Sequence, residues 1–158
     1  MDRLNTICSQ FQLEGTILTV KPLGEGFIND TLLITTAEAT APNYILQRKN
    51  KNIFTNIPAM MDNINRVCEH LKKKVVAAGG DPMREAMTII PTKDGKLYYQ
   101  DEDGEFWAIC VFIGDTIAYQ KADTPALAYQ GGKGIGKFQA MLSDFHESLA
   151  DILPGFHN

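Results

Sequence analysis

A glycine-containing turn between two β-rich runs is the feature that most constrains this sequence. Gly24 and Gly26 are separated by one residue, and they fall between the runs 15–23 and 31–35, which are rich in strand-favouring residues. Glycine adopts positive φ angles and lets the backbone approach a ligand closely. The pattern predicts a hairpin whose tip offers free N–H groups to phosphate oxygens. The alternative is a hairpin in which the glycines serve only the turn, because a single Gly-x-Gly is a weak signal.

The composition is typical of one globular domain. With 158 residues, 44% of them hydrophobic and 22% charged, the chain can bury a sizeable core. A net charge of −4 argues against a nucleic-acid partner, which would need a basic face. Cys8, Cys68 and Cys110 lie far apart without metal-ligand spacing, as reduced cytosolic thiols do. Nothing at the N-terminus resembles a signal peptide and no apolar run approaches about 18 residues, so we expect a cytoplasmic protein without a membrane partner.

Hydrophobic periodicity predicts the order of the helices and strands. Apolar residues at helical spacing favour a short helix over 2–13 and a long one from about 57 to the stop at Gly79. A third helix is expected over 125–146. Its four glycines cost roughly 1 kcal/mol each relative to alanine, so we expect close packing to explain them. Strands are expected over residues 16–22, 27–36, 44–48, 87–91, 96–100 and 105–113.

These elements predict an α+β fold in two parts. Residues 1–113 would form an antiparallel sheet of five or six strands with one long helix packed on it. Residues 114–158 would form a linker and the first helix of a second, helical region. The glycine turn leads into a strand and not into a helix, which disfavours a dinucleotide-binding oxidoreductase.

The order of the parts indicates a phosphate-binding lobe. The glycine turn precedes a strand that ends in Gln47 and Arg48, and the long helix that follows carries Asp62 and Glu69. An apolar strand then runs into the linker. This is the order of the small lobe of protein kinases, in which a glycine loop covers the phosphates and a helix acid holds the strand cation that neutralises them.

Several segments together resemble a known family. They are Gly24–Thr31, Tyr44–Arg48 with Asn50, Ile53–Phe54, Ile57–Ile64, Gly95–Trp107, Phe112–Thr116 and Gly134–Leu142. With them the chain resembles the aminoglycoside phosphotransferase superfamily, and within it the branch of N-acetylhexosamine 1-kinases. The resemblance covers nearly the whole chain and implies the N-terminal lobe of a protein-kinase-like fold, which binds ATP with Mg²⁺.

The resemblance also implies which residues bind the nucleotide. Either Gln47 or Arg48 would face the phosphates, because strand alternation places only one of them on the inner face. Asp62, in preference to Glu69, would be the helix acid. The full set implied is Gly24, Gly26, Asn29, Asp30, Thr31, Gln47, Arg48 and Asp62, with Val111, Phe112 and Ile113 as the hinge beside adenine.

Expectations about activity follow from the same resemblance. Enzymes of this family carry a catalytic-loop Asp and Asn, and then a metal-binding Asp, after the region matched here. The 158 residues hold no counterpart. We therefore expect nucleotide binding without phosphoryl transfer by this chain alone, and binding of the sugar substrate, such as N-acetylglucosamine or N-acetylgalactosamine, only with the missing lobe.

A function of another class is the alternative. The chain would then be a non-catalytic α+β interaction module that forms a homodimer through exposed apolar surface. That surface would include Phe112, Ile113, Phe138 and Phe145. Saturable ATP binding favours the nucleotide-binding lobe, and a dimer that ignores ATP favours the module.

Overall fold

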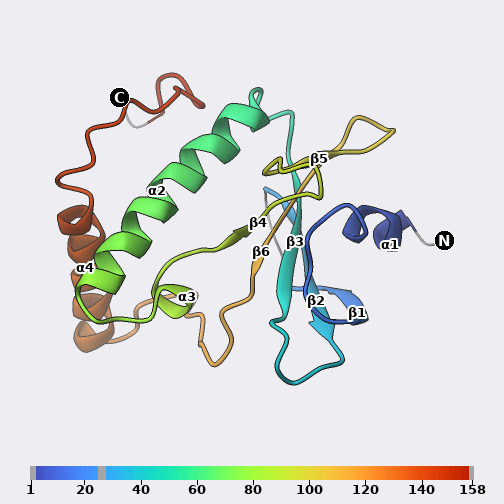
Figure 1. Cartoon of the computed structure of the whole chain (residues 1–158). Coiled ribbons are helices and arrows are strands. Elements are labelled where there is room, and N and C mark those ends of the chain that lie inside the picture. The colour runs from blue at the N-terminus through green and yellow to red at the C-terminus, as the bar shows by residue number, and fades with distance from the viewer. Residues whose placement is uncertain (1–2, 25–27, 157–158) are drawn as a thin grey trace.

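A computed structural model describes residues 3–24 and 28–156, and it has an α+β fold built on one antiparallel sheet (Figure 1). The sheet has six strands in the order β1-β2-β3-β6-β4, and β5 also pairs with β6. The predicted α+β class and the antiparallel sheet of five or six strands are confirmed. In chain order the elements are α1 (Arg3–Cys8), β1 (Ile17–Pro22), β2 (Asp30–Thr36), β3 (Tyr44–Lys49), α2 (Ile57–Ala77), α3 (Pro82–Glu85), β4 (Ile89–Ile90), β5 (Tyr99–Gln100), β6 (Phe106–Val111) and α4 (Pro125–Met141).

Helices lie on both faces of the sheet. Figure 1 shows α1 on one side of the strands and α2 on the other. On the α1 face, Ile7 and Phe11 pack with sheet residues that include Tyr44 and Trp107. On the α2 face, the buried side chains are Ile57, Met60, Met61 and Ala108. Because successive strand residues point to opposite faces, β4 and β6 contribute to both layers, with Ile89 and Ala108 on the α2 side and Ile90 and Trp107 on the α1 side.

The long helix α2 forms where its sequence signals place it. The side chain of Asn56 caps its N-terminus by accepting a hydrogen bond from the Ala59 N–H at 3.1 Å, and Pro58 occupies the first turn. Its buried residues recur at helical spacing from Ile57 to Val75. Gly79, just beyond the helix end, has a φ of 74°. The predicted helix is confirmed.

Other elements differ in length from the predicted ones. The first helix has six residues and ends at Cys8, and strands β4 and β5 have two residues each. Pro91 directly follows β4 and has no N–H to continue the ladder. The short helix α3 was not predicted; Asp81 caps it by accepting from the Met83 N–H at 2.9 Å.

Helix α4 packs loosely within the described chain. It begins after Thr124, whose side chain accepts from the Leu127 N–H at 3.1 Å, and none of its residues is buried. A Cβ added at Gly131, Gly132, Gly134 or Gly136 would meet nothing within 4 Å. The prediction that close packing explains these glycines is therefore wrong for contacts within the described residues.

Candidate functional site

The register of β2 and β3 brings together most of the residues expected to line the phosphates. Asp30 lies opposite Arg48 and Thr31 lies opposite Gln47. The Gln47 Nε2 donates to Thr31 Oγ1 at 3.2 Å, and Arg48 Nε donates to Asp30 Oδ2 at 2.7 Å. Asn29, just before β2, accepts a hydrogen bond from the backbone N–H of the residue that follows β3, Asn50, at 3.0 Å. These hydrogen bonds therefore link the polar groups of β2 and β3 at the same end of the sheet.

The structure places Gln47 and Arg48 on opposite faces. Gln47 lies across from Ala108, which belongs to the core on the α2 face. Arg48 lies across from Trp107, which belongs to the core on the α1 face. Residues directly opposite each other in neighbouring strands share a face. Of the two alternatives left open by the sequence, Gln47 is the one on the α2 face.

Lys49 places a cation on the α2 face, and sequence reasoning missed it. The strand was predicted to end at Arg48, but β3 continues to Lys49, which is only 8% exposed and lies opposite Phe106. Its Nζ donates to Gln47 Oε1 at 2.6 Å, and it forms no ion pair with a carboxylate among residues 3–24 and 28–156. Burial lowers the pKa of Lys49. Extending the strand alternation by one residue would have found it.

A polar cavity of about 230 Å³ lies at this end of β3. Its cations are Arg48, Lys49 and Lys51, and its acids are Asp30 and Glu105. Two of the cations are matched, since Arg48 pairs with Asp30 and Lys51 pairs with Glu105 at 2.6 Å. Of the three cations, Lys49 is the one whose ammonium has no acidic partner among the described residues. The remaining lining residues are Ile28, Asn50 and Asn52.

The described part of the glycine turn has the expected backbone conformation. Gly24 has a φ of 68°, and a Cβ there would meet nothing within 4 Å. The N–H of Leu23 donates to the Thr31 carbonyl oxygen at 2.9 Å, which closes the hairpin below the turn. Gly24 lines a second cavity, of about 460 Å³, together with residues of the α1 face such as Trp107. Gly26 lies outside the described residues.

Two of the three expected hinge amides are already bonded. The N–H of Val111 donates to the Thr88 carbonyl at 2.9 Å, and the N–H of Phe112 donates to the Asn43 carbonyl at 2.8 Å. The N–H of Ile113 has no hydrogen-bond partner within the described residues. Of the hinge residues, Ile113 therefore has the available donor.

The acids of α2 are not brought to β3. Asp62 pairs with Arg66, one turn along the same helix, at 3.5 Å. Glu69 pairs with Lys72 at 2.9 Å. Both carboxylates are exposed, and neither forms an ion pair with a β3 cation in this structure.

The α2 face of β2, β3 and β6 carries a half-buried surface that neither hydrophobic core includes. Cross-strand pairing places Leu33 opposite Ile45, and Ile45 opposite Cys110. All three side chains are half-buried, and none belongs to the two packed clusters. Thr31 and Gln47 continue this surface towards Lys49. An apolar centre with a few polar groups at one end is the kind of lining that small-molecule sites have.

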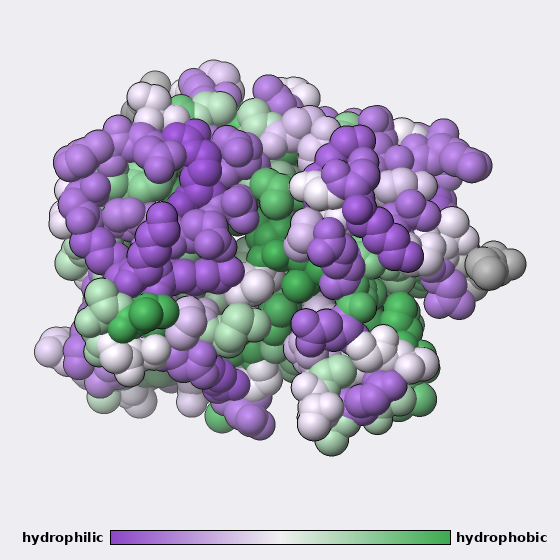
Figure 2. Space-filling model, in the orientation of Figure 1, coloured by the Kyte–Doolittle hydropathy of each residue, from purple (hydrophilic) through white to green (hydrophobic). Residues whose placement is uncertain are grey.

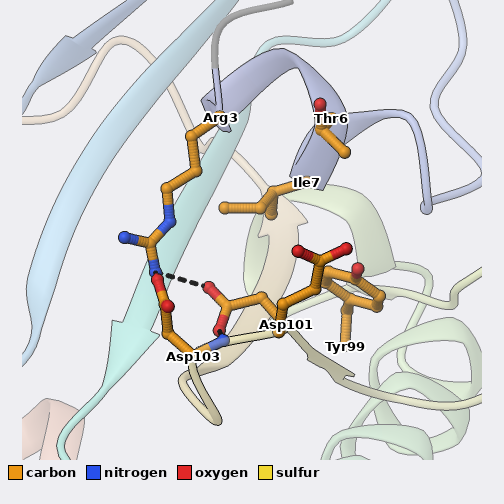
Figure 3. Close-up of a pocket in the computed structure, with 7 residues that line it drawn as sticks. Arg3, Thr6, Ile7, Tyr99, Asp101 and Asp103 are labelled. Atoms are coloured by element: carbon orange, nitrogen blue, oxygen red, sulfur yellow. Dashed lines mark hydrogen bonds and ion pairs between the residues drawn. The ribbon is translucent and has the colours of Figure 1, made fainter.

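A cavity of about 340 Å³ beside α1 is lined by residues whose contacts hold α1 to the sheet (Figure 3). In it, the Oδ2 of Asp101 accepts from Arg3 at 2.7 Å and from the Trp107 Nε1 at 2.8 Å, while its Oδ1 accepts from the N–H groups of Asp103 and Glu105. Partial burial works to raise the pKa of Asp101, but the hydrogen bonds from Arg3 and Trp107 outweigh it and leave the pKa lowered. This carboxylate ties α1 to the β5–β6 turn.

No family model matches the chain. Within residues 3–24 and 28–156, no group of three or more His, Cys, Asp and Glu side chains could hold a metal ion, so the described residues do not fit a Mg²⁺ site by themselves. Across the same residues, none of the helices has the length and apolar character needed to cross a membrane.

Proposed function

We propose that this chain is a nucleotide-binding lobe of an ATP-dependent small-molecule kinase, with the fold of a protein-kinase N-lobe. The order of the parts supports the proposal: a glycine hairpin, a strand with a cation, a long helix and an apolar strand that leads into a linker. The single observation that carries it is Lys49, a buried cation on the same face as the half-buried surface of Leu33, Ile45 and Cys110.

Lys49 favours an anionic ligand for an energetic reason. Burial of an ammonium without an acidic partner costs free energy, because the charge loses its hydration. Gln47 supplies one acceptor to Lys49 Nζ, which has three donors. A phosphate group would accept from the remaining donors and neutralise the charge. In this proposal Lys49 takes the role that the sequence had suggested for Arg48.

In this proposal the rest of the nucleotide lies along the α2 face. Adenine would lie against Leu33, Ile45 and Cys110 and accept from the Ile113 N–H. The phosphates would extend past Thr31 and Gln47 to Lys49. The helix acid expected at Asp62 has no part in this arrangement. Positioning of Mg²⁺ and of the acceptor needs groups other than those described, so the proposal concerns nucleotide binding.

The acceptor is proposed on the sequence resemblance alone. An amino sugar such as N-acetylglucosamine or N-acetylgalactosamine is the acceptor class it implies. An assay of ATP consumption with a panel of hexosamines, on a protein that joins this lobe to a catalytic lobe, tests the acceptor. Lack of turnover with every hexosamine would contradict the proposed acceptor class. It would not bear on nucleotide binding, which is tested separately.

Titration with ATP, followed by calorimetry, tests the binding function. We expect saturable binding by the unmodified chain and by Arg48→Met, whose side chain lies on the α1 face. Lys49→Met should lose most of the affinity. Equal affinity of the two variants would contradict the assignment of Lys49, and the absence of binding by the folded chain would contradict the proposed function.

The exposed side chains of α4 favour a second candidate, the self-associating module. Tyr129 is 69% exposed and Ile135 is 64% exposed, and both lie on this helix. Phe138 is also exposed, whereas Phe145 packs edge-on against His70 with ring centroids 5.3 Å apart. A homodimer on gel filtration that Tyr129→Lys disrupts, in a chain that does not bind ATP, would favour this module over the nucleotide-binding lobe.

A further inference from the structure

The segment that follows α4 runs along α2 in the opposite direction. Asp144 pairs with Lys74, and its Oδ1 lies within hydrogen-bond distance of His70 Nε2, at 3.1 Å. Three residues later, Glu147 accepts from Arg66 Nε at 2.6 Å. Figure 1 shows this C-terminal segment beside α2, on the side away from the strands.

Asn63 recognises the backbone of this segment. Its Nδ2 donates to the Ala150 carbonyl oxygen at 2.8 Å, and its Oδ1 accepts from the Ala150 N–H at 3.0 Å. One amide side chain thus satisfies both backbone groups of a single residue. Such a pair of bonds fixes the position of the segment whatever side chain stands at 150.

The segment ends in the core between α2 and the sheet. Ile152 packs against the cluster of Ile57, Met60, Met61 and Ala108. The α2 residues that hold the segment form one stripe at helical spacing, here called the docking stripe: Asn63, Arg66, His70 and Lys74. All four are half-buried, whereas neighbouring positions such as Asp62 and Glu69 are exposed. Polar contacts along the stripe and an apolar anchor at its end therefore act on the same helix.

We propose that residues 144–152 form a clamp that fixes α2 against the sheet, and that Asn63 is its main positioning residue. The ion pairs at Arg66 and Lys74, whose carboxylate partners are exposed, contribute little by themselves. The double hydrogen bond at Asn63 and the burial of Ile152 contribute more. The clamp holds α2 at two points, its middle and its N-terminal turn, where Ile57 and Met60 meet Ala108.

The clamp reaches the proposed nucleotide site through one strand pair. Ala108, in the cluster that Ile152 enters, lies directly opposite Gln47 of β3. Displacement of α2 would therefore disturb the strand position beside Gln47 and Lys49. This consequence rests on the proposed function, whereas the clamp itself does not.

Hydrogen exchange of the unliganded chain tests the clamp. In Asn63→Ala we expect backbone amides throughout α2 to exchange about tenfold faster, because two hydrogen bonds are lost. Asn5→Ala, at an exposed position of α1, serves as the matched control and should leave α2 unchanged. Faster exchange confined to 144–152, with α2 at the unmodified rate, would overturn the proposal.

A charge-exchange pair gives a second test that does not depend on Asn63. Arg66→Glu and Glu147→Arg should each accelerate exchange in α2, and the double variant should restore part of the protection, because residue 66 also lies beside Asp62. Lack of restoration in a folded double variant would contradict the clamp. ATP titration of the unmodified chain separates the two proposals. If the unmodified chain binds ATP but α2 exchange is unchanged in Asn63→Ala, only the clamp is contradicted. If α2 exchange is faster in Asn63→Ala but the unmodified chain does not bind ATP, only the nucleotide function is contradicted.

Discussion

Lys49 Nζ donates to Gln47 Oε1 at 2.6 Å on the α2 face of β3, while Arg48 between them faces the other side of the sheet. This relationship makes Lys49→Met an informative change. The unfolding free energy of the variant should exceed that of the unmodified chain by about 1–3 kcal/mol, because a desolvated charge is replaced by an apolar side chain. ATP affinity should fall about ten- to hundredfold, because a charge-assisted hydrogen bond is lost. Denaturant unfolding and calorimetry measure the two effects. Lower stability of Lys49→Met together with unchanged ATP affinity would contradict the role of Lys49 as a buried cation that binds a phosphate of ATP.

The pH dependence of stability provides a separate prediction for Lys49. Burial lowers its pKa in the folded state below the ordinary value of 10.5. Between the folded pKa and 10.5 the unfolded chain binds more protons than the folded chain, so the contribution of Lys49 to the unfolding free energy rises with pH. Below the folded-state pKa, Lys49 is charged in both states, so the full free-energy cost of burying its charge lowers the stability of the folded chain. Denaturant unfolding from about pH 8 to 10.5 should show this rise in the unmodified chain relative to Lys49→Met. Parallel curves for the two proteins would contradict it.

Asp101 should stabilise the fold more than its neighbour Asp103. The side chain of Asp101 is 9% exposed and accepts four hydrogen bonds, whereas that of Asp103 is 68% exposed and pairs only with Arg3, at 2.8 Å, within the described residues. Asp101→Asn should lower the unfolding free energy by about 2–3 kcal/mol. Asp103→Asn, the control, should change it by less than about 1 kcal/mol. Similar losses in the two variants would show that the hydrogen bonds of Asp101 contribute little.

The glycines of α4 should tolerate alanine. Since a Cβ at Gly132 or Gly136 meets nothing within 4 Å, each change to alanine should stabilise the helix by about 0.5–1 kcal/mol. Slower amide exchange in α4 and increased helical circular dichroism would measure this. Gly15→Ala is a contrasting variant, because Gly15 has a φ of 81° and an added Cβ would lie 2.6 Å from that of Ala41. Loss of helicity on substitution at Gly132 would indicate that this surface packs against another body.

Local patterns predicted the layers of this fold well. The apolar stripe from Ile57 to Val75, with Asn56 before it and Gly79 after it, contains all that is needed to place α2. Strand alternation and turn residues likewise predicted an antiparallel sheet. Each of these signals depends on neighbours within a few residues, and such information is present in the sequence itself.

The candidate site was harder to predict because it depends on single residues and distant partners. One additional residue in β3 brings Lys49 onto the α2 face, and a strand boundary is uncertain by more than one residue from sequence. Asp62 pairs with Arg66 on the same helix, which i,i+4 spacing permits but does not require. The hinge amide of Phe112 bonds to Asn43, a contact that only the β3–β6 pairing reveals.

The central claim is that a nucleotide binds on the α2 face of β2, β3 and β6, and amide and methyl NMR during ATP titration tests it most directly. We predict saturable shifts at Leu33, Ile45 and the Gln47 side-chain amide, with little change at α1-face residues such as Leu32 and Leu46. Shifts confined to the α1 face, or no shifts with ATP in millimolar excess, would contradict the claim.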